Sequence, residues 1–147
     1  MRDAIFQAIV NILKGLDCLK GSDGTVRVYP YERAIPEGYP AVNVVSTRLE
    51  SSVLDNARDV RKYFYLIRVV QEKISENEGG FGPEKAERVA RQREDEILRA
   101  FDQNNDLDVD GVIRTLPVSV DWRKHPSEPR IILDITLAVE TVVPISM

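Results

Sequence analysis

The chain lacks most of the features that define disulfide-linked, membrane-spanning or secreted proteins. Among its 147 residues there is one cysteine, Cys18, so no intrachain disulfide can form, which fits a reducing compartment. No apolar run approaches the roughly 20 residues that cross a bilayer. The N-terminal segment has one basic residue followed by Asp3 and no small-residue cleavage site, so it predicts a helix start and not a signal peptide. We expect a protein synthesised in a cytoplasm, with no membrane partner.

Residues for catalysis are equally scarce. His125 is the sole histidine, and only Cys18 could join it as a metal ligand, which is too few for a zinc site. No Gly-x-Ser-x-Gly nucleophile elbow is present, so the sequence gives no support for a Ser-His-Asp site. We therefore expect no catalytic residue, no cofactor and no enzymatic activity.

The charge balance has no basic excess. The chain carries 20 Lys and Arg against 24 Asp and Glu, a net charge of −4, which argues against a general nucleic-acid binder. With 43% hydrophobic and 30% charged residues it is globular in composition. Its length is that of one ordinary domain, spanning residues 1–147.

What the chain does have is a long alternating strand near its end. From Arg130 to Glu140 one face carries only aliphatic side chains: Ile131, Leu133, Ile135, Leu137 and Val139. The other face is mostly polar, with Ile132 and Ala138 as exceptions. Because strand side chains alternate between faces, this pattern predicts a strand with one buried side.

The remaining periodicity gives the other elements. Helical spacing predicts a helix that begins at Asp3 and a longer one that begins at Pro83 and ends before Asn104. Four further strands are predicted at Thr25–Tyr31, Ala41–Leu49, Val60–Glu72 and Gly111–Trp122. This order predicts an α+β fold, an antiparallel or mixed sheet of about five strands with an N-terminal helix and one long helix packed on one face.

For two of these strands the sequence also predicts which faces are apolar. Val60–Glu72 has apolar side chains on both faces, so we expect a central strand covered by a helix on one side and by a neighbouring subunit on the other. In Gly111–Trp122, one face is expected to carry Val112, Leu116, Val118, Val120 and Trp122.

The sharpest local motif is acidic. Asp106, Asp108 and Asp110, followed by Gly111, match the first half of an EF-hand calcium loop and are the only candidate metal ligands. Position twelve of that loop is Pro117, which cannot supply the bidentate carboxylate. The residues after Gly111 also alternate like a strand. The segment is therefore interpreted as a helix-to-strand turn.

Two groups of side chains are candidates for a binding surface. The aromatic cluster could bind a partner or could belong to the core, and both interpretations stay open; it comprises Tyr29, Tyr31, Tyr39, Tyr63, Phe64 and Tyr65. The long helix interleaves Lys and Arg with Glu and Asp, which favours a solvated or subunit-facing surface over a nucleic-acid site.

Several segments together resemble the tail-terminator (tail-completion) proteins of long-tailed bacteriophages. They are the N-terminal amphipathic helix, a strand opened by Pro40–Val44, the long strand Tyr63–Glu72, the long helix and the two final strands. The resemblance covers nearly the whole chain as a pattern. It implies a small α+β subunit that forms a ring on top of the tail tube, and it carries over no catalytic or binding residue.

The resemblance also implies partners. These are other copies of the chain in a ring, expected to be a hexamer, a tail tube protein and a head-completion or neck protein, with DNA passing through the channel without specific binding. The expected location is the tail or neck of a virion. Two alternatives are another phage neck or tail adaptor, and a cytoplasmic ligand-binding or regulatory domain that responds to calcium through Asp106, Asp108 and Asp110.

Such a ring needs two different patches on each subunit. We expect one from the tyrosine-rich second and third strands and the other from the charged face of the long helix. The loops Asn104–Asp110 and Arg123–His125 bracket the fourth strand and are expected on opposite faces of the ring.

Overall fold

The elements follow the predicted order along the chain. The computed structural model describes residues 2–21, 24–31, 38–53, 58–72, 82–123 and 130–144. In chain order the elements are helix α1 (Arg2–Lys14), the 3-10 turn η1 (Asp17–Leu19), strands β1 (Arg27–Tyr29), β2 (Ala41–Val53) and β3 (Arg58–Glu72), helix α2 (Gly82–Gln103), and strands β4 (Val112–Arg123) and β5 (Arg130–Pro144).

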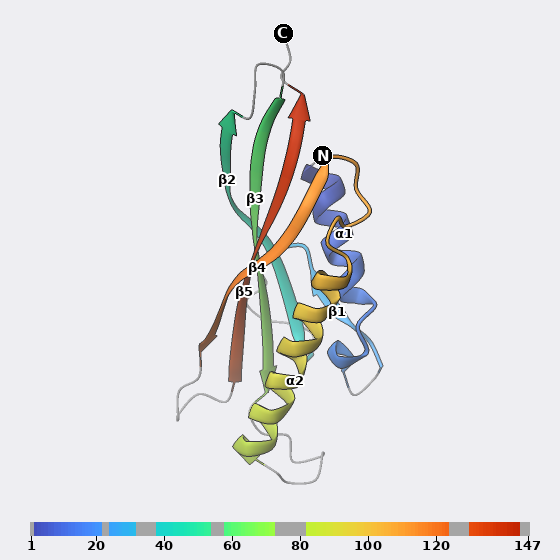
Figure 1. Ribbon diagram of the computed structural model, residues 1–147. Coiled ribbons are helices and arrows are strands. Elements are labelled where there is room, and N and C mark those ends of the chain that lie inside the picture. The colour runs from blue at the N-terminus through green and yellow to red at the C-terminus, as the bar shows by residue number, and fades with distance from the viewer. Residues whose placement is uncertain are drawn as a thin grey trace.

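The strands form one mixed sheet with both helices on the same face (Figure 1). The spatial order is β1-β2-β3-β5-β4, with β1 parallel to β2 and every other neighbouring pair antiparallel. This confirms the predicted α+β fold. It also confirms β3 as the central strand, with two strands on either side.

The hydrophobic core lies between the sheet and the helices. The five aliphatic side chains predicted to share one face of β5, from Ile131 to Val139, are at most 1% exposed. They meet the odd-numbered residues of β3 and the apolar stripes of both helices. Those stripes are Ile5, Ile9 and Leu13 of α1 with Ala90, Ile97 and Phe101 of α2.

A buried polar link ties α2 to the sheet. Gln71 of β3 is 2% exposed, and its Nε2 donates to the Ala86 carbonyl at 2.7 Å. Arg93 of α2 donates through Nη1 to Gln71 Oε1 at 2.6 Å and through Nε to the Cys18 carbonyl at 2.9 Å. These bonds satisfy polar groups that burial would otherwise penalise.

The predicted facing of β4 is partly wrong, because the strand contains two β-bulges. The register shifts between Val112 and Arg114 and again between Pro117 and Ser119. Each bulge adds one residue and reverses the facing of the strand residues after it. Val120 and Trp122 do face the core, opposite Ile135 and Leu133. Leu116 lies opposite Ala138 on the helix-free face, and Val118 is a bulge residue that is 52% exposed.

Candidate functional site

The acidic segment after α2 forms a turn. Asp106 Oδ1 accepts the backbone N–H of Asp108 at 2.9 Å, and Leu107 and Asp108 both have φ near 54°. Leu107 is 5% exposed and anchors the turn in the core. Pro117, the twelfth position of the EF-hand pattern, lies within β4. Among the residues that the structure describes, no three His, Cys, Asp or Glu side chains are grouped to hold a metal ion.

The other sequence candidates do not combine into a reactive site. His125 and the neighbouring Lys124 lie outside the described residues. Cys18 is half-buried, and its burial, together with a hydrogen bond to Glu96, raises the pKa of the thiol to about 12. With this raised pKa the thiol is almost entirely protonated near neutral pH, so it is a poor nucleophile.

The aromatic cluster is divided between several places. Tyr63 and Tyr65 are 6% and 1% exposed on the helix side of β3, and Phe6 of α1 lies 6.0 Å from the Tyr65 ring. They belong to the core, so the expectation that the tyrosines of the second and third strands form an exposed interface patch is wrong. Tyr31, in contrast, is 52% exposed beside Tyr29.

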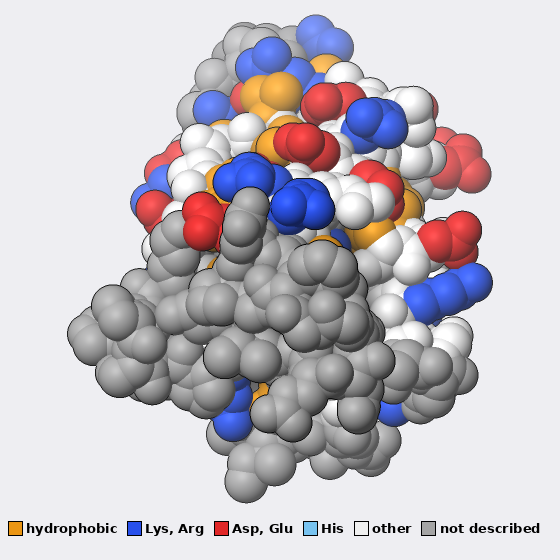
Figure 2. All heavy atoms as spheres, turned by 90° about the horizontal axis from the view of Figure 1, so that it is seen from below, with side chains coloured by type: hydrophobic (Ala, Val, Ile, Leu, Met, Phe, Trp, Pro, Cys, Tyr) orange, Lys and Arg blue, Asp and Glu red, His pale blue; other side chains and the backbone are white. Residues whose placement is uncertain are grey.

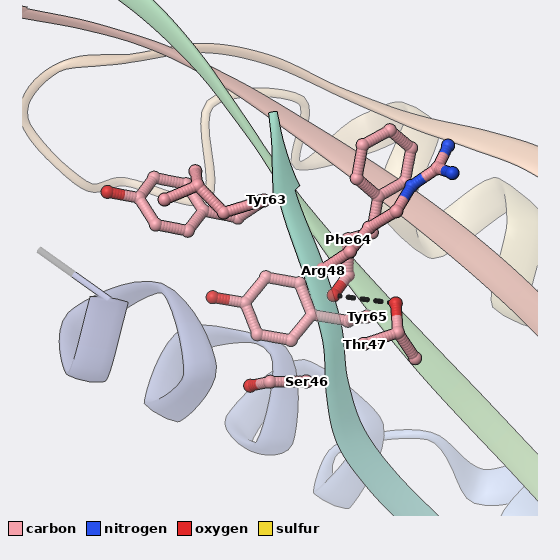
Figure 3. Close-up of a pocket in the computed structure, with 7 residues that line it drawn as sticks. Ser46, Thr47, Arg48, Tyr63, Phe64 and Tyr65 are labelled. Atoms are coloured by element: carbon pink, nitrogen blue, oxygen red, sulfur yellow. Dashed lines mark hydrogen bonds between the residues drawn. The ribbon is translucent and has the colours of Figure 1, made fainter. Parts of the chain in front are cut away.

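A small cavity of about 180 Å³ lies at the β-bulge in β2 (Figure 3). Thr47 is the bulge residue, and its hydroxyl donates to the Phe64 carbonyl at 3.1 Å. In Figure 3, Tyr63 and Tyr65 point to one side of the sheet, and Arg48 and Phe64 point to the other. Pockets for small-molecule ligands hold roughly 300–1,000 Å³, so this cavity is too small for a substrate of ordinary size.

The face of the sheet opposite the helices, called here the helix-free face, carries a row of alternating charges. Glu50, Lys62, Glu140 and Arg114 lie side by side across β2, β3, β5 and β4. Glu140 accepts Arg114 Nε at 2.6 Å and lies 3.4 Å from Lys62 Nζ. The hydrogen bond from Arg114 is the main reason why the pKa of Glu140 is lowered.

A second set of ion pairs lies further along the helix-free face. Arg68 donates to both oxygens of Asp134, at 2.8 and 3.3 Å, and Arg123 reaches Asp134 at 2.9 Å. Between the two charged sets, the Arg48 guanidinium lies 4.2 Å from the centre of the Phe64 ring. Phe64 is therefore 7% exposed although no described helix covers this face. Across the two sets the cations Arg48, Lys62, Arg68, Arg114 and Arg123 outnumber the acids Glu50, Glu140 and Asp134. This part of the face therefore has a small basic excess, and its cations are held in ion pairs or against the Phe64 ring.

The exposed large apolar side chains gather at the two borders of the sheet. Within the described part of the chain they are Tyr31 and Leu49 at the β1–β2 border, and Ile113 and Val118 on β4. Ile113 and Val118 are the two bulge residues of β4, so the bulges turn aliphatic groups outward. The borders of the sheet are thus the best candidates for contact with another protein.

The charged helix and the surface around it show mixed signs. Arg91 of α2 pairs with Glu87 at 3.7 Å, the i,i+4 spacing expected of a solvated helix face. Viewed from below, the described part of the molecular surface shows acidic and basic side chains interspersed (Figure 2). No helix in the described residues is both long and apolar enough to cross a bilayer.

Comparison with known proteins gives a likeness of fold and none of sequence. No protein family matches the chain. A search of curated proteins by sequence also finds no match. Among solved structures, the fold is similar to a chain in the structure titled "Virion of native gene transfer agent (GTA) particle". That match has a TM-score of 0.62 and 15% identity, and it covers 97% of both chains.

Proposed function

We propose that this chain is a virion structural protein, a tail terminator whose copies form a ring that caps the tail tube and joins it to the head. The observation that carries the proposal is the likeness of fold to a chain of a gene transfer agent virion over 97% of both chains. A likeness over the length of both chains supports a shared role better than one confined to a single motif. It agrees with the element order that resembles tail-terminator proteins.

The geometry supports a role in assembly instead of catalysis. The cavity at the β2 bulge is small, and the half-buried thiol of Cys18 has a raised pKa. The exposed apolar groups lie instead at the two borders of the sheet, and these borders differ in residue content. Two unlike patches on one subunit are what a closed ring requires, because each copy presents one patch to the copy before it and the other to the copy after it.

A terminator must also present different ends to the tube and to the head. The turn at Asn104–Asp110 precedes β4 and Arg123 closes it, so the acidic turn and the basic end lie at opposite ends of this strand. With the strands running between the two faces of the ring, one face meets the tube protein and the other the neck protein. Ion pairs with Glu140 and Asp134 partly neutralise the cations of the helix-free face, which suits a channel that lets DNA pass without holding it tightly.

A second virion role fits the same likeness of fold. Another neck or tail adaptor would share the ring architecture but would not control the length of the tube. The phenotype of particles made without the protein separates the two roles.

The test is removal of the gene from the phage or particle that encodes it, followed by electron microscopy of the products. A terminator predicts filled heads without tails and free tails of uncontrolled length. An adaptor predicts free tails of normal length. Normal tails joined to heads would refute both roles. Expression of the protein in trans should restore complete particles, which controls for effects on neighbouring genes.

A further inference from the structure

Among the described residues, the sheet has two edges with no neighbouring strand over most of their length. β1 covers only the first three residues of β2, Ala41–Asn43, so no described strand lies beside β2 from Val44 onward. On the opposite side, β4 pairs with β5 alone in the described part of the chain. Free edges offer backbone groups to a further strand unless a local feature blocks them.

The first half of β4 is blocked. The N–H of Thr115 is bound by the side-chain oxygen of Asn105 at 2.8 Å, so it points away from β5 and is already satisfied. The backbone of Pro117, two residues further on, also faces away from β5, and proline has no N–H to donate. Neither obstacle is present in the second half, where the strand is regular from Ser119 to Arg123 after the bulge at Val118. Only that half can accept another strand.

Alternation of backbone groups identifies the outward residues of this second half. Val142 N–H donates to the Gly111 carbonyl at 3.0 Å, so even-numbered residues of β5 direct their backbone groups toward β4. Asp121 lies opposite the even-numbered Asp134 and therefore faces β5. Its neighbour Val120 directs its backbone groups outward.

The same alternation reaches β2 through β3. Odd-numbered residues of β5 face β3, so even-numbered residues of β3 face β2, as the hydrogen bond from Thr47 to the Phe64 carbonyl also shows. Arg48 lies opposite Phe64 and therefore faces β3. The next residue, Leu49, directs its backbone groups outward.

We propose that copies of the chain join edge to edge, with the second half of β4 in one copy pairing antiparallel with β2 of the next, and Val120 opposite Leu49. The pairing specifies the contact of the proposed ring and rests on that function. The direction follows from the sheet, because three antiparallel steps separate β2 from β4. Two copies placed side by side in the same orientation therefore present antiparallel edges.

Side chains favour this register. On the helix side, Leu49, 43% exposed in the single copy, gains Val120 of its neighbour as an apolar partner. On the helix-free face the same register sets Asp121 opposite Arg48, so opposite charges meet. A shift by two residues in one direction would set Arg48 opposite Arg123. A shift in the other direction would set Pro117, which has no N–H to donate, directly opposite Leu49.

The register also sets a tilt that suits ring closure. Within one copy Val120 lies level with Val44, so pairing Leu49 of the next copy with Val120 displaces that copy along the strands. Leaving out the bulge residue, the displacement is four strand residues of about 3.3 Å, or about 13 Å. Each copy adds four strand spacings of about 4.8 Å, or about 19 Å, across the sheet. The ratio of the displacement to the width gives a tilt of the strands from the ring axis of about 35°, within the range typical of closed β-barrels.

Disulfide trapping tests the pairing. The variant combines Arg48→Cys with Asp121→Cys in a Cys18→Ser background. Both cysteines are at exposed positions, and in the proposed register they form a cross-strand pair close enough for a disulfide. On a denaturing gel, the oxidised protein should give a ladder of cross-linked oligomers that ends at the closed ring and collapses to monomer on reduction. Circular dichroism before oxidation shows that the variant folds.

Three controls make the result specific. Each single-cysteine variant should run as a monomer on the same denaturing gel. Cross-linked dimers of Arg48→Cys alone or of Asp121→Cys alone would indicate a symmetric contact and overturn the proposal. Glu50→Cys with Arg114→Cys, which would be adjacent only without the displacement, should give no ladder. Absence of the ladder from the Arg48→Cys and Asp121→Cys variant would overturn the pairing. If the protein forms rings but the cross-linked ladder is absent, the pairing is wrong and the terminator function stands. If the ladder forms but particles made without the gene have normal tails joined to heads, the function is wrong and the pairing stands.

Discussion

The link between Gln71 and Arg93 should be an important source of stability, because it holds α2 against the sheet inside a buried region. Gln71 is 2% exposed and makes two short side-chain hydrogen bonds, to Arg93 Nη1 at 2.6 Å and to the Ala86 carbonyl at 2.7 Å. Gln71→Met keeps a similar volume and removes both bonds. The carbonyl of Ala86 then stays buried without this donor, and Arg93 loses this acceptor.

The expected cost is set by typical hydrogen-bond energies. A bond to a charged group contributes about 1.5–3 kcal/mol and a neutral one about 1 kcal/mol, while the apolar Met recovers part of the loss. We expect Gln71→Met to lower the free energy of unfolding by about 2 kcal/mol. In a domain of this length that corresponds to a fall in Tm of about 7 °C.

A double-mutant cycle in urea measures whether the two residues act together. Arg93→Met removes the donor, and the double variant removes both groups, so its cost should fall short of the sum of the single costs by about 1 kcal/mol or more. Gln92→Met, at an exposed position of the same helix, is the matched control and should change stability by less than about 0.5 kcal/mol. Additive single costs would refute the link.

Three further predictions concern metal, pH and the thiol. Calcium or a chelator should leave Tm unchanged, because the acidic segment is held as a turn by the Asp106–Asp108 hydrogen bond; a rise worth about 1 kcal/mol or more would contradict this. Glu140→Gln should lower the free energy of unfolding at neutral pH and have little effect in acid. The pKa of Glu140 is lower in the folded protein than in the unfolded chain, so its carboxylate stabilises the fold at any pH above the unfolded-state pKa. That stabilisation is lost as the pH falls through the folded-state pKa. Urea titrations at both pH values measure this, with the exposed Glu50→Gln as control, and an unchanged difference in acid would contradict it. Cys18, with its pKa raised to about 12, should react with iodoacetamide at pH 8 far more slowly in the native protein than in urea, and equal rates would show that the thiol is open.

The sequence predicts the fold well where one strong pattern decides it. The alternation from Ile131 to Val139 predicts the buried face of β5. Apolar side chains on both faces of β3 predict its central position in the sheet. Both succeed because burial against the helices depends on the period of the pattern, which the sequence displays directly.

The sequence does not predict the facing of β4. Its two bulges reverse the facing twice, and neither Ile113 nor Val118 differs from an ordinary strand residue in the sequence. The signal that points to the second bulge is Pro117, since proline within a strand marks an edge or a bulge. The sequence also does not show which strands lie at the two edges of the sheet, because strand order and backbone orientation are properties of the folded sheet. It therefore could not point to these edges as an interface.

The tyrosines show the opposite error. Tyr63 and Tyr65 suggest an interface by residue type, yet both are buried in the core, and Phe6 of α1 packs against Tyr65. Packing against elements distant in the sequence decides which face is exposed. The residue types therefore predict the central strand correctly and its exposed face incorrectly.

A closed ring of this chain at the end of the tail is the property on which the proposed function depends. A cryo-electron microscopy reconstruction of the junction between head and tail in intact particles would show whether the ring exists. We expect one ring of this chain between the end of the tube and the neck, with neighbouring copies joined through β2 and β4. A reconstruction that places the chain elsewhere in the particle, or finds no ring of it at the junction, would contradict the proposed function.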